Sequence, residues 1–256
     1  MHELEAVYTV WLREMLRYIR ARERIIGSLA MPIFWLLIFG SSIRASVGMD
    51  IDYTSFIAPG IITMALMFNS IFSGITVIWD RELGFMKEML VAPISRLSIV
   101  AGKALGGAMT ALIQAMFLLL LVFAIKSLSS EYFIAVKMDV LVFLVMVPMM
   151  VLIALGLVGI GIAIASSLDT LEGFGLIMNF VVMPMFFLSG ALFPINNLPS
   201  WIRVITYLDP VTYGVELLRS ILIGFSSINI GISFSVVLVF SGSMLLVGAY
   251  LFSKRS

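Results

Sequence analysis

The chain has 256 residues, of which 61% are hydrophobic and only 12% charged, with a net charge of +1. A soluble domain is about 45–50% apolar and about 25% charged, and a soluble fold of this length cannot bury so much apolar surface, so the composition predicts an integral membrane protein. The near-neutral charge gives no sign of a nucleic-acid partner, the lack of cysteine excludes disulfides and thiolate metal sites, and a lone histidine, His2, argues against histidine-based catalysis.

Residues 3–24 have the periodicity of an amphipathic helix. At about 100° per residue, the apolar side chains fall on one half of the helix and four arginines fall within a narrow opposite arc. We expect a helix in the inner membrane interface, with its arginines available to phosphates or to a partner protein. The alternative is a tail that only orients the chain. The apolar set is Leu4, Val7, Tyr8, Trp11, Leu12, Met15, Leu16 and Ile19, and the arginines are Arg13, Arg17, Arg20 and Arg24.

Six segments are apolar and long enough to span a bilayer, which takes about 20 residues. The first is longer than the apolar region of a cleavable signal peptide, so we expect it to stay as an anchor. A further apolar stretch, 198–225, is interrupted by Asp209-Pro210 and by other charges, which disfavour a span. The sequence thus predicts an all-α membrane protein with one transmembrane domain over residues 1–256. The expected spans are 25–43, 56–79, 104–125, 140–166, 174–193 and 228–252.

The distribution of basic residues predicts the orientation. With the N-terminus inside, the inner segments carry most of the 16 lysines and arginines, as the positive-inside rule requires. An even number of spans then places both termini in the cytoplasm. The inner set is Arg13, Arg17, Arg20, Arg22, Arg24, Arg81, Lys87, Arg96, Lys103, Lys254 and Arg255, and the outer set is Arg44, Lys126, Lys137, Arg203 and Arg219.

The cytoplasmic loop after the second span reads DRELGFMKEMLVAPISR over residues 80–96. Asp80 can cap a short helix there, and Ala92-Pro93 would end it. Such a helix would present apolar side chains between charged ones and could seat in a groove on a cytoplasmic partner. An ordinary solvated loop accounts for the residues equally well. The apolar contacts would be Phe85, Met86 and Met89, and the polar ones Arg81, Glu82, Lys87 and Glu88.

A second segment of interest lies outside the membrane in this orientation and begins FPINNLPSW at residue 193. Two helices, about 200–208 and 211–223, would meet at Asp209-Pro210, and both are too short to span. We expect a hairpin that dips into the outer leaflet beside an exit; the alternative is a loop lying flat on the surface. Glu216 and Arg219 can pair on one helix face, and Trp201, Tyr207 and Tyr213 suit the interface. Its marker residues are Pro194, Pro199, Trp201, Asp209, Pro210, Glu216 and Arg219.

Several motifs that carry chemistry are missing from the sequence. There is no phosphate-binding G-x-x-x-x-G-K-[ST] loop and no metal-ligating cluster, so neither ATP hydrolysis nor a metal site is expected in this chain. Glycines such as Gly156, Gly159 and Gly161 are interpreted as sites of close helix packing. The spans hold almost no ionisable groups, whereas proton- or sodium-coupled carriers use buried carboxylates. Energy for uphill transport would then enter through another protein.

Together these segments resemble the membrane subunit of ABC type-2 exporters, and the daunorubicin-resistance type of permease most of all. The first match is WDRELGFMKEMLVAPIS at 79–95, continuing to Gly102-Lys103. The second is LSGALFP at 188–194, followed by Leu198-Pro199, by DPVTY at 209–213 and by Leu218-Arg219. The resemblance covers nearly the whole chain. Phe85 stands where many relatives have threonine, and Asp209 where many have asparagine.

The resemblance implies a homodimer of this chain with two copies of a separate ATPase, which would hold the ATP and magnesium. It implies that a loop helix over residues 81–91 docks on the ATPase, helped by the N-terminal helix and by the loop near Asp169 and Glu172. It also implies a substrate path between protomers, lined by the first, second and fifth spans. The coupling candidates are Arg81, Glu82, Gly84, Phe85, Lys87, Glu88, Pro93, Arg13 and Arg17, and the path candidates are Phe68, Phe72, Asn179, Phe186 and Phe187.

The function expected from this resemblance is ATP-dependent export of hydrophobic, drug-like or lipid-linked substrates across the cytoplasmic membrane of a prokaryote. One rival is export of lipid-linked polysaccharide by the same machinery. Another is a self-sufficient channel or secondary carrier. A third, an intramembrane enzyme, is disfavoured because the spans lack buried His, Asp or Glu pairs.

Overall fold

The computed structural model describes residues 2–42, 53–128, 136–137 and 139–255. Every regular element in these ranges is helical, as the composition predicts. The helices are α1 (His2–Arg20), α2 (Arg22–Ser42), α3 (Tyr53–Ser73), α4 (Ile75–Glu82), α5 (Phe85–Val91), α6 (Arg96–Leu128), α7 (Val140–Ser167), α8 (Leu171–Ile177), η1 (Met178–Val182), α9 (Met183–Leu188), η2 (Ile195–Asn197), α10 (Ser200–Leu208), α11 (Pro210–Ile223) and α12 (Ile230–Arg255).

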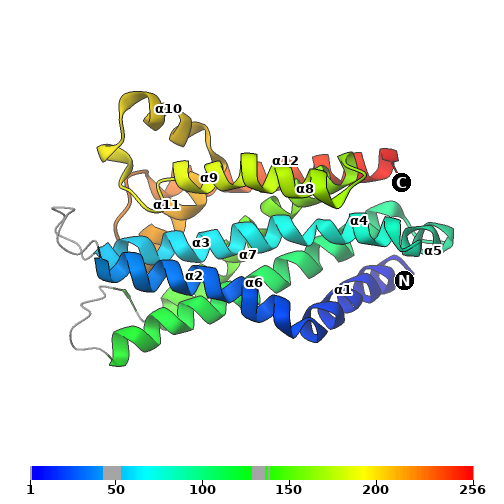
Figure 1. Ribbon diagram of the computed structural model, residues 1–256, viewed down its shortest axis with the longest axis horizontal. Coiled ribbons are helices and arrows are strands. Elements are labelled where there is room, and N and C mark those ends of the chain that lie inside the picture. Colours follow the sequence, from blue (N-terminus) through cyan, green and yellow to red (C-terminus); the bar gives the residue numbers. More distant parts are fainter. Residues whose placement is uncertain (1, 43–52, 129–135, 138, 256) are drawn as a thin grey trace.

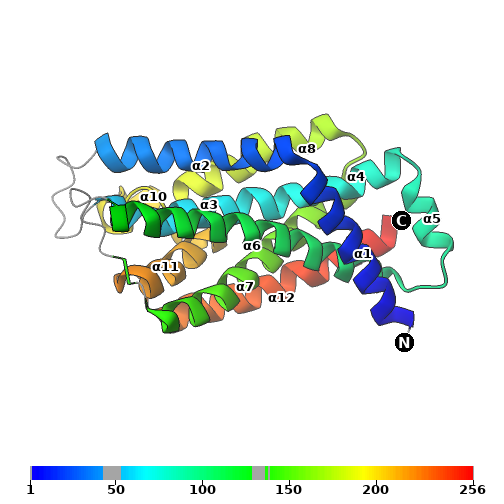
Figure 2. The ribbon, with the colours of Figure 1, turned by 90° about the horizontal axis from the view of Figure 1, so that it is seen from below.

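The helices form an elongated bundle with distinct ends (Figure 1). The two ends of the chain lie together with α5 at one end, and α10 and α11 lie at the other. Within the bundle α7 packs along α12, α3 and α6, while α2 packs on α3 (Figure 2). The bundle therefore separates the predicted coupling loop from the predicted outer hairpin by the full length of its long helices.

Five helical segments are long and apolar enough to cross a membrane: Tyr53–Glu82, Arg96–Ser127, Val140–Ser167, Leu171–Leu188 and Ile230–Lys254. They correspond to the second through sixth predicted spans. The first predicted span, 25–43, coincides with α2, whose apolar part Ile25–Ile38 is shorter, and residue 43 lies outside the described residues. The count of six spans therefore stays a prediction.

The fifth predicted span ends earlier than expected, at Leu188 rather than residue 193. Gly190 has φ of 73°, a left-handed conformation that glycine adopts without strain and that does not continue a helix. The same span contains a π-helical turn, η1, directly before Pro184. Because proline has no N–H and its ring crowds the preceding turn, a local widening of the helix at this place is expected.

Glycines let the central helices approach closely, as predicted. A Cβ atom on Gly161 of α7 would lie 2.9 Å from the Cα of Ile71 on α3, and one on Gly159 would lie 2.6 Å from the carbonyl carbon of Met244 on α12. Both distances are shorter than van der Waals contact, so only glycine fits. These positions fix the spacing of α3, α7 and α12.

The N-terminal helix α1 forms as predicted and packs across α6 at Gly102 and Gly106. Its start is held by Glu3, whose carboxylate accepts hydrogen bonds from Ser95 and Ser98. These bonds, that from Ser98 above all, hold the pKa of Glu3 below its ordinary value. The helix also carries exposed apolar side chains, namely Leu4, Tyr8, Leu16 and Ile19, of which Leu4 is 80% exposed. An interfacial position agrees with these exposed apolar side chains.

Candidate transport cavity and cytoplasmic coupling surface

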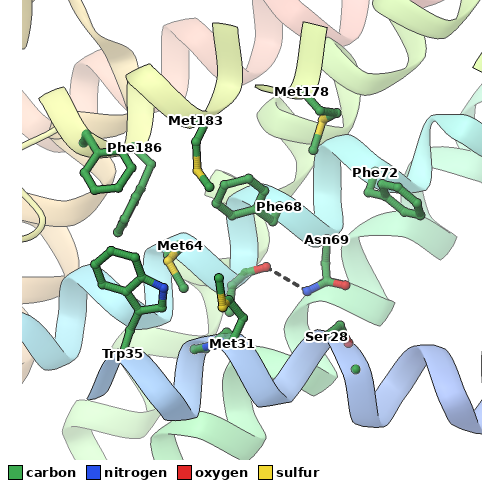
Figure 3. A pocket seen from close by; sticks show the side chains of 14 residues that line it. Ser28, Met31, Trp35, Met64, Phe68, Asn69, Phe72, Met178, Met183 and Phe186 are labelled. Atoms are coloured by element: carbon green, nitrogen blue, oxygen red, sulfur yellow. Dashed lines mark hydrogen bonds between the residues drawn. The ribbon is translucent and has the colours of Figure 1, made fainter. Parts of the chain in front are cut away.

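A cavity of about 430 Å³ lies between α2, α3 and the η1–α9 segment (Figure 3). These three elements correspond to the first, second and fifth predicted spans. Its size is within the range of small-molecule sites, which is about 300–1,000 Å³. The resemblance implied a path between two protomers lined by these spans; within one chain, the structure brings the three elements together around one cavity. The lining residues are Gly27, Ser28, Met31, Pro32, Trp35, Met64, Ala65, Phe68, Asn69, Phe72, Met178, Met183, Phe186 and Phe187.

The cavity wall is made chiefly of aromatic and methionine side chains. Trp35 meets Phe187 with ring centroids 5.8 Å apart, and Phe186 meets Phe68 at 6.4 Å. Methionines are flexible and polarisable, so they adapt to ligands of different shapes. Among the described residues of the wall, Asn69 is the one amide, and its side-chain N–H is already bonded to the Ala65 carbonyl at 3.0 Å. The cavity therefore suits an apolar or amphipathic molecule and offers little to a strongly polar one.

Four of the five path candidates line this cavity: Phe68, Phe72, Phe186 and Phe187. The fifth, Asn179, does not, because it lies in the π-helical turn with its side chain exposed. Sequence reasoning missed Trp35, Asn69 and the methionines. Asn69 carried a signal, since few amides occur in the spans, but an aromatic or methionine on an apolar helix is indistinguishable from a packing residue before the helices are placed. The role of all these residues in transport stays a prediction.

At the end of the bundle that holds α5, the predicted loop helix is divided. Arg81 and Glu82 belong to α4, and α5 begins only at Phe85. Gly84 separates the two helices with φ of 81°, which explains the break. The helix ends as predicted before Pro93, because Ala92 takes the extended conformation that a following proline favours.

Asp80 does not cap a helix, contrary to the prediction. It lies within α4, fully buried, and accepts hydrogen bonds from the two N-terminal arginines. Arg13 reaches its two carboxylate oxygens at 2.5 and 3.2 Å, and Arg17 reaches one at 3.1 Å. Two of the four arginines expected to be available to phosphates or to a partner, Arg13 and Arg17, therefore bind within the protein and link α1 to α4, whereas Arg20 is exposed.

Lys103 on α6 completes this buried charge cluster. Its ammonium group is hydrogen-bonded to Asp80, to Glu14 at 3.2 Å and to the Thr76 hydroxyl at 3.3 Å. The five charged side chains come from α1, α4 and α6. Their contacts join these three helices next to the loop that the sequence predicts to face the ATPase. The cluster consists of Arg13, Glu14, Arg17, Asp80 and Lys103, and is called the Asp80 cluster below.

Some of the other coupling candidates are exposed, and others contact residues elsewhere in the chain. Glu82, Lys87 and Glu88 are exposed, and Phe85 is partly exposed with Arg13 lying 5.2 Å from its ring centroid. Arg81 bonds to the Leu168 carbonyl at 3.2 Å and to Asp169 at 3.4 Å, so the two predicted cytoplasmic loops do meet. Met86, expected as a contact for a partner, is only 4% exposed and belongs to the core.

A groove of about 740 Å³ runs between α1 and α5. Its walls carry both charged and apolar side chains, and it lies at the end of the bundle that holds both chain ends. Such a groove has the dimensions for a short helix or loop from another protein. Its walls are formed by Glu5, Ala6, Thr9, Val10, Arg13, Phe85, Glu88, Met89, Ala92, Pro93 and Ile94.

The hairpin at the other end has the two predicted helices, α10 and α11, joined at Asp209-Pro210. Asp209 caps α11 through the Val211 N–H at 2.9 Å, and Pro210 occupies the first turn, where its missing N–H costs nothing. Pro194 and Pro199 precede η2 and α10 in extended conformations. Trp201 on α10 is exposed, whereas Glu216 and Arg219 on α11 form the predicted pair but are fully buried.

Comparison with known proteins shows to which family this combination of an apolar bundle, a predicted coupling loop and a hairpin belongs. A family profile described as "ABC-2 type transporter" matches residues 5–223, which is most of the chain. The chain belongs to the ABC-2 type transporter family. As a permease of this family it is a multi-pass transmembrane subunit of a transporter, and family membership implies an ABC ATPase as partner.

Relatives of this ABC-2 permease carry several transport-related names. It is 28% identical over 276 residues to "Putative transport permease ycf38" of Cyanophora paradoxa, covering 98% of this chain and 89% of the relative. It is 25% identical to "Nodulation protein J" of Rhizobium leguminosarum bv. viciae, covering 96% and 93%. It is 29% identical to "Probable multidrug ABC transporter permease YbhR" of Escherichia coli K12, covering 71% of this chain but 47% of that protein.

Proposed function

We propose that this ABC-2 permease forms the membrane part of an ATP-driven exporter of hydrophobic, drug-like or amphipathic molecules, lipid-linked ones included. The observation that carries the proposal is the apolar cavity between α2, α3 and η1–α9. Aromatic and methionine walls with one internally bonded amide favour apolar cargo over free sugars or ions. The word "multidrug" in the name of one relative points in the same direction.

In this proposal two permease chains form a homodimer and bind two copies of a separate ATPase. The chain crosses the cytoplasmic membrane of a prokaryote six times, with both termini in the cytoplasm. The placement of both chain ends beside α5 supports this topology (Figure 1), because an even number of crossings returns the chain to its starting side. The excess of arginine and lysine at that end supports the cytoplasmic orientation.

Energy would enter through α5 and the groove beside it. Movement of the ATPase would push on exposed residues such as Lys87 and Glu88. The Asp80 cluster would pass that push from α4 to α1 and α6, since buried charge pairs couple helices that carry them. The α3 helix, which continues into α4 and lines the cavity, would transmit the motion to the cargo.

The first test is purification of the tagged permease in mild detergent from cells that express its native partners. We expect an ATPase subunit to copurify in equimolar amount. Reconstitution of that complex should give ATP-dependent movement of an apolar fluorescent dye, and the permease alone should give none. A permease that purifies alone and transports without ATP would contradict the proposal and favour a self-sufficient channel or carrier.

A further inference from the structure

Arg219 is a fully buried arginine at the hairpin end of the bundle, and it contacts several separate segments. One terminal nitrogen donates to the carbonyls of Gly190 at 2.9 Å and Ala191 at 3.2 Å. Its Nε donates to the Phe56 carbonyl at 3.4 Å, and its carbon Cζ lies 3.9 Å from the centroid of the Phe56 ring. One side chain on α11 therefore joins the first turn of α3 to the chain directly after α9.

The charge of Arg219 is neutralised within its own helix. Glu216, one turn earlier on α11, pairs with the guanidinium through one carboxylate oxygen. Its other oxygen accepts hydrogen bonds from the N–H groups of Ser227 and Ile228, before α12. Because a buried charge is tolerated only when it is paired, this arrangement lets α11 carry an arginine through the interior.

The segment held by Arg219 is a turn, residues 189–193, that follows α9 and is buried except at Phe193, which is 47% exposed. Its backbone is too irregular to satisfy its own carbonyls, so side chains from other elements donate to them. Besides Arg219, the hydroxyl of Tyr53 donates to the Leu192 carbonyl at 3.0 Å. Gly60 on α3 gives room for the turn, because a Cβ there would lie 2.9 Å from the Ala191 Cα. The turn is therefore seated on the beginning of α3.

The two elements joined in this way are those that line the cavity. Phe186 and Phe187 precede the turn on α9, and Met64 and Phe68 lie farther along α3. Gly60, against which the turn is seated, is followed at intervals of four residues along α3 by Met64 and Phe68 of the cavity wall, so the turn lies beside the cavity toward the hairpin end. We propose that Arg219 is a positioning residue for transport, which holds the cavity closed at the hairpin end by fastening the 189–193 turn to α3.

The arrangement of charges makes this fastening reversible. Glu216 and Arg219 share α11, so their ion pair persists when the turn moves away. Separation then breaks hydrogen bonds from the guanidinium to carbonyls without leaving a buried charge unpaired. Arginine is needed because its planar fork reaches several carbonyls at once, whereas a lysine presents a single point of charge. The inference rests on the proposed export function and its orientation, which place the hairpin end outside.

The chain contains no cysteine, so single introduced cysteines can report access without background. The reporter is Met64→Cys, in the cavity wall, treated in intact cells with a charged thiol reagent that does not cross membranes. With Arg219 present we expect slow labelling. Arg219→Gln should raise the labelling rate about tenfold, because a tenfold shift in a closed–open equilibrium raises the accessible population equally. Arg219→Lys should give a smaller increase.

Two controls separate opening from general damage. Arg203→Gln removes an arginine of the same hairpin whose hydrogen bonds to the described residues go to the nearby carbonyls of Asn196 and Leu198, so the Met64→Cys rate should not change. Ala154→Cys, buried in α7, should stay unlabelled in every background unless the bundle unfolds. If Arg219→Gln does not fold, the double variant Arg219→Gln/Glu216→Gln removes both charges and should also label quickly.

The orientation is tested separately by Asn197→Cys, at the exposed end of η2 before α10. If this cysteine is not labelled from outside, the proposed orientation is wrong, whatever Arg219 does. If it is labelled while Met64→Cys reacts equally slowly with and without Arg219, the fastening role is overturned and the export proposal stands. Fast labelling of Met64→Cys in the presence of Arg219 would also overturn it, since the cavity would already be open at that end.

Discussion

Arg13 and Asp80 come from two segments that were both expected to face a partner, yet they bind each other, with Arg13 Nη2 2.5 Å from the Asp80 carboxylate. Arg17 and Lys103 share the same carboxylate. The N-terminal helix is thus fastened to the coupling loop by buried charges. In the proposed mechanism α1 is therefore part of the relay between the loop and the membrane helices, and its expected help in docking the ATPase stays a prediction.

We predict that Asp80→Asn detaches α1 from α4. The substitution leaves Arg13, Arg17 and Lys103 without their shared carboxylate, and removal of one partner from a buried pair costs about 3 kcal/mol or more. The melting temperature of the purified permease should fall, and protease cleavage near the α1–α2 junction should become faster. ATPase activity of the complex should no longer respond to cargo.

The matched control for this prediction is Asp169→Asn. Asp169 also accepts from an arginine of α4, Arg81, but its side chain is 85% exposed. Exposed ion pairs contribute about 0–1 kcal/mol, so this variant should melt close to the unchanged protein. Equal melting temperatures for Asp80→Asn and the unchanged protein would show that the Asp80 cluster does not hold α1.

A second prediction concerns the exposed face of α5. Glu88 is exposed on the groove wall opposite residues of α1, and it has no buried partner among the residues that the structure describes. Glu88→Lys should leave membrane insertion and melting unchanged but weaken binding of the ATPase at least about tenfold, because a like-charge contact at an interface is strongly unfavourable. Affinity of the ATPase for the detergent-solubilised permease measures the effect.

Glu23→Lys serves as the control for Glu88, because it makes the same charge change at an exposed site on α2. Its affinity for the ATPase should equal that of the unchanged protein. If Glu88→Lys and Glu23→Lys both bind the ATPase normally, Glu88 is not part of the docking surface. If both bind weakly, net charge at this end explains the loss, and the groove is not required.

Because Asp209 is buried, we predict that the stability of the protein depends on pH. It lies between α10 and α11, which are too short to span a membrane. Burial raises its pKa to about 7, although the Val211 N–H opposes the shift. Because the folded-state pKa exceeds the ordinary value of 3.8, the folded protein binds the proton more tightly than the unfolded chain. Protonated Asp209 therefore contributes to the stability of the folded protein. This contribution is fully present below about pH 4 and is lost as the pH rises through about 7, and the free energy of unfolding falls by at most about 4 kcal/mol in all.

The test of this prediction is Asp209→Asn, which resembles the protonated carboxyl and cannot ionise. Melting temperature should fall between about pH 5 and about pH 8 for the unchanged protein and fall less for the variant. At the higher pH the asparagine variant should be the more stable of the two. Parallel pH profiles for both proteins would mean that Asp209 is already ionised, or protonated, throughout this range.

The helices were predictable because their causes are local. Apolar runs, the Ala92-Pro93 stop and the Asp209-Pro210 break act within a few residues, and the structure has the expected element at each. The Glu216–Arg219 pair was predictable for the same reason, since three residues on a helix fix its geometry. The early end of the fifth span was missed because Gly190 gives no hydrophobicity signal.

The contacts between distant segments were not predictable from one sequence. Arg13 and Asp80 are separated by 67 residues, and Arg219 and Phe56 by 163. The positive-inside rule counts an arginine in the same way whether its side chain faces solvent or binds a buried carboxylate, so the sequence does not distinguish the two cases. The cavity was predicted only in outline. Its aromatic residues can be recognised as a wall only after α2, α3 and α9 have been placed around a common space.

Because α3 and α7 are in close contact, we predict that one methyl group added at Gly161 strongly destabilises the fold. Gly161→Ala would place a Cβ 2.9 Å from the Ile71 Cα, against backbone that cannot rotate away. Overpacking of this kind costs about 1–3 kcal/mol, so the melting temperature should fall and the cavity-lining face of α3 should shift. Gly242→Ala is the control, because a Cβ there on α12 meets nothing within 4 Å. It should melt at the same temperature or higher, since alanine favours helix over glycine by about 1 kcal/mol. If the two alanine variants melt alike, close packing at Gly161 does not set the spacing of α3 and α7.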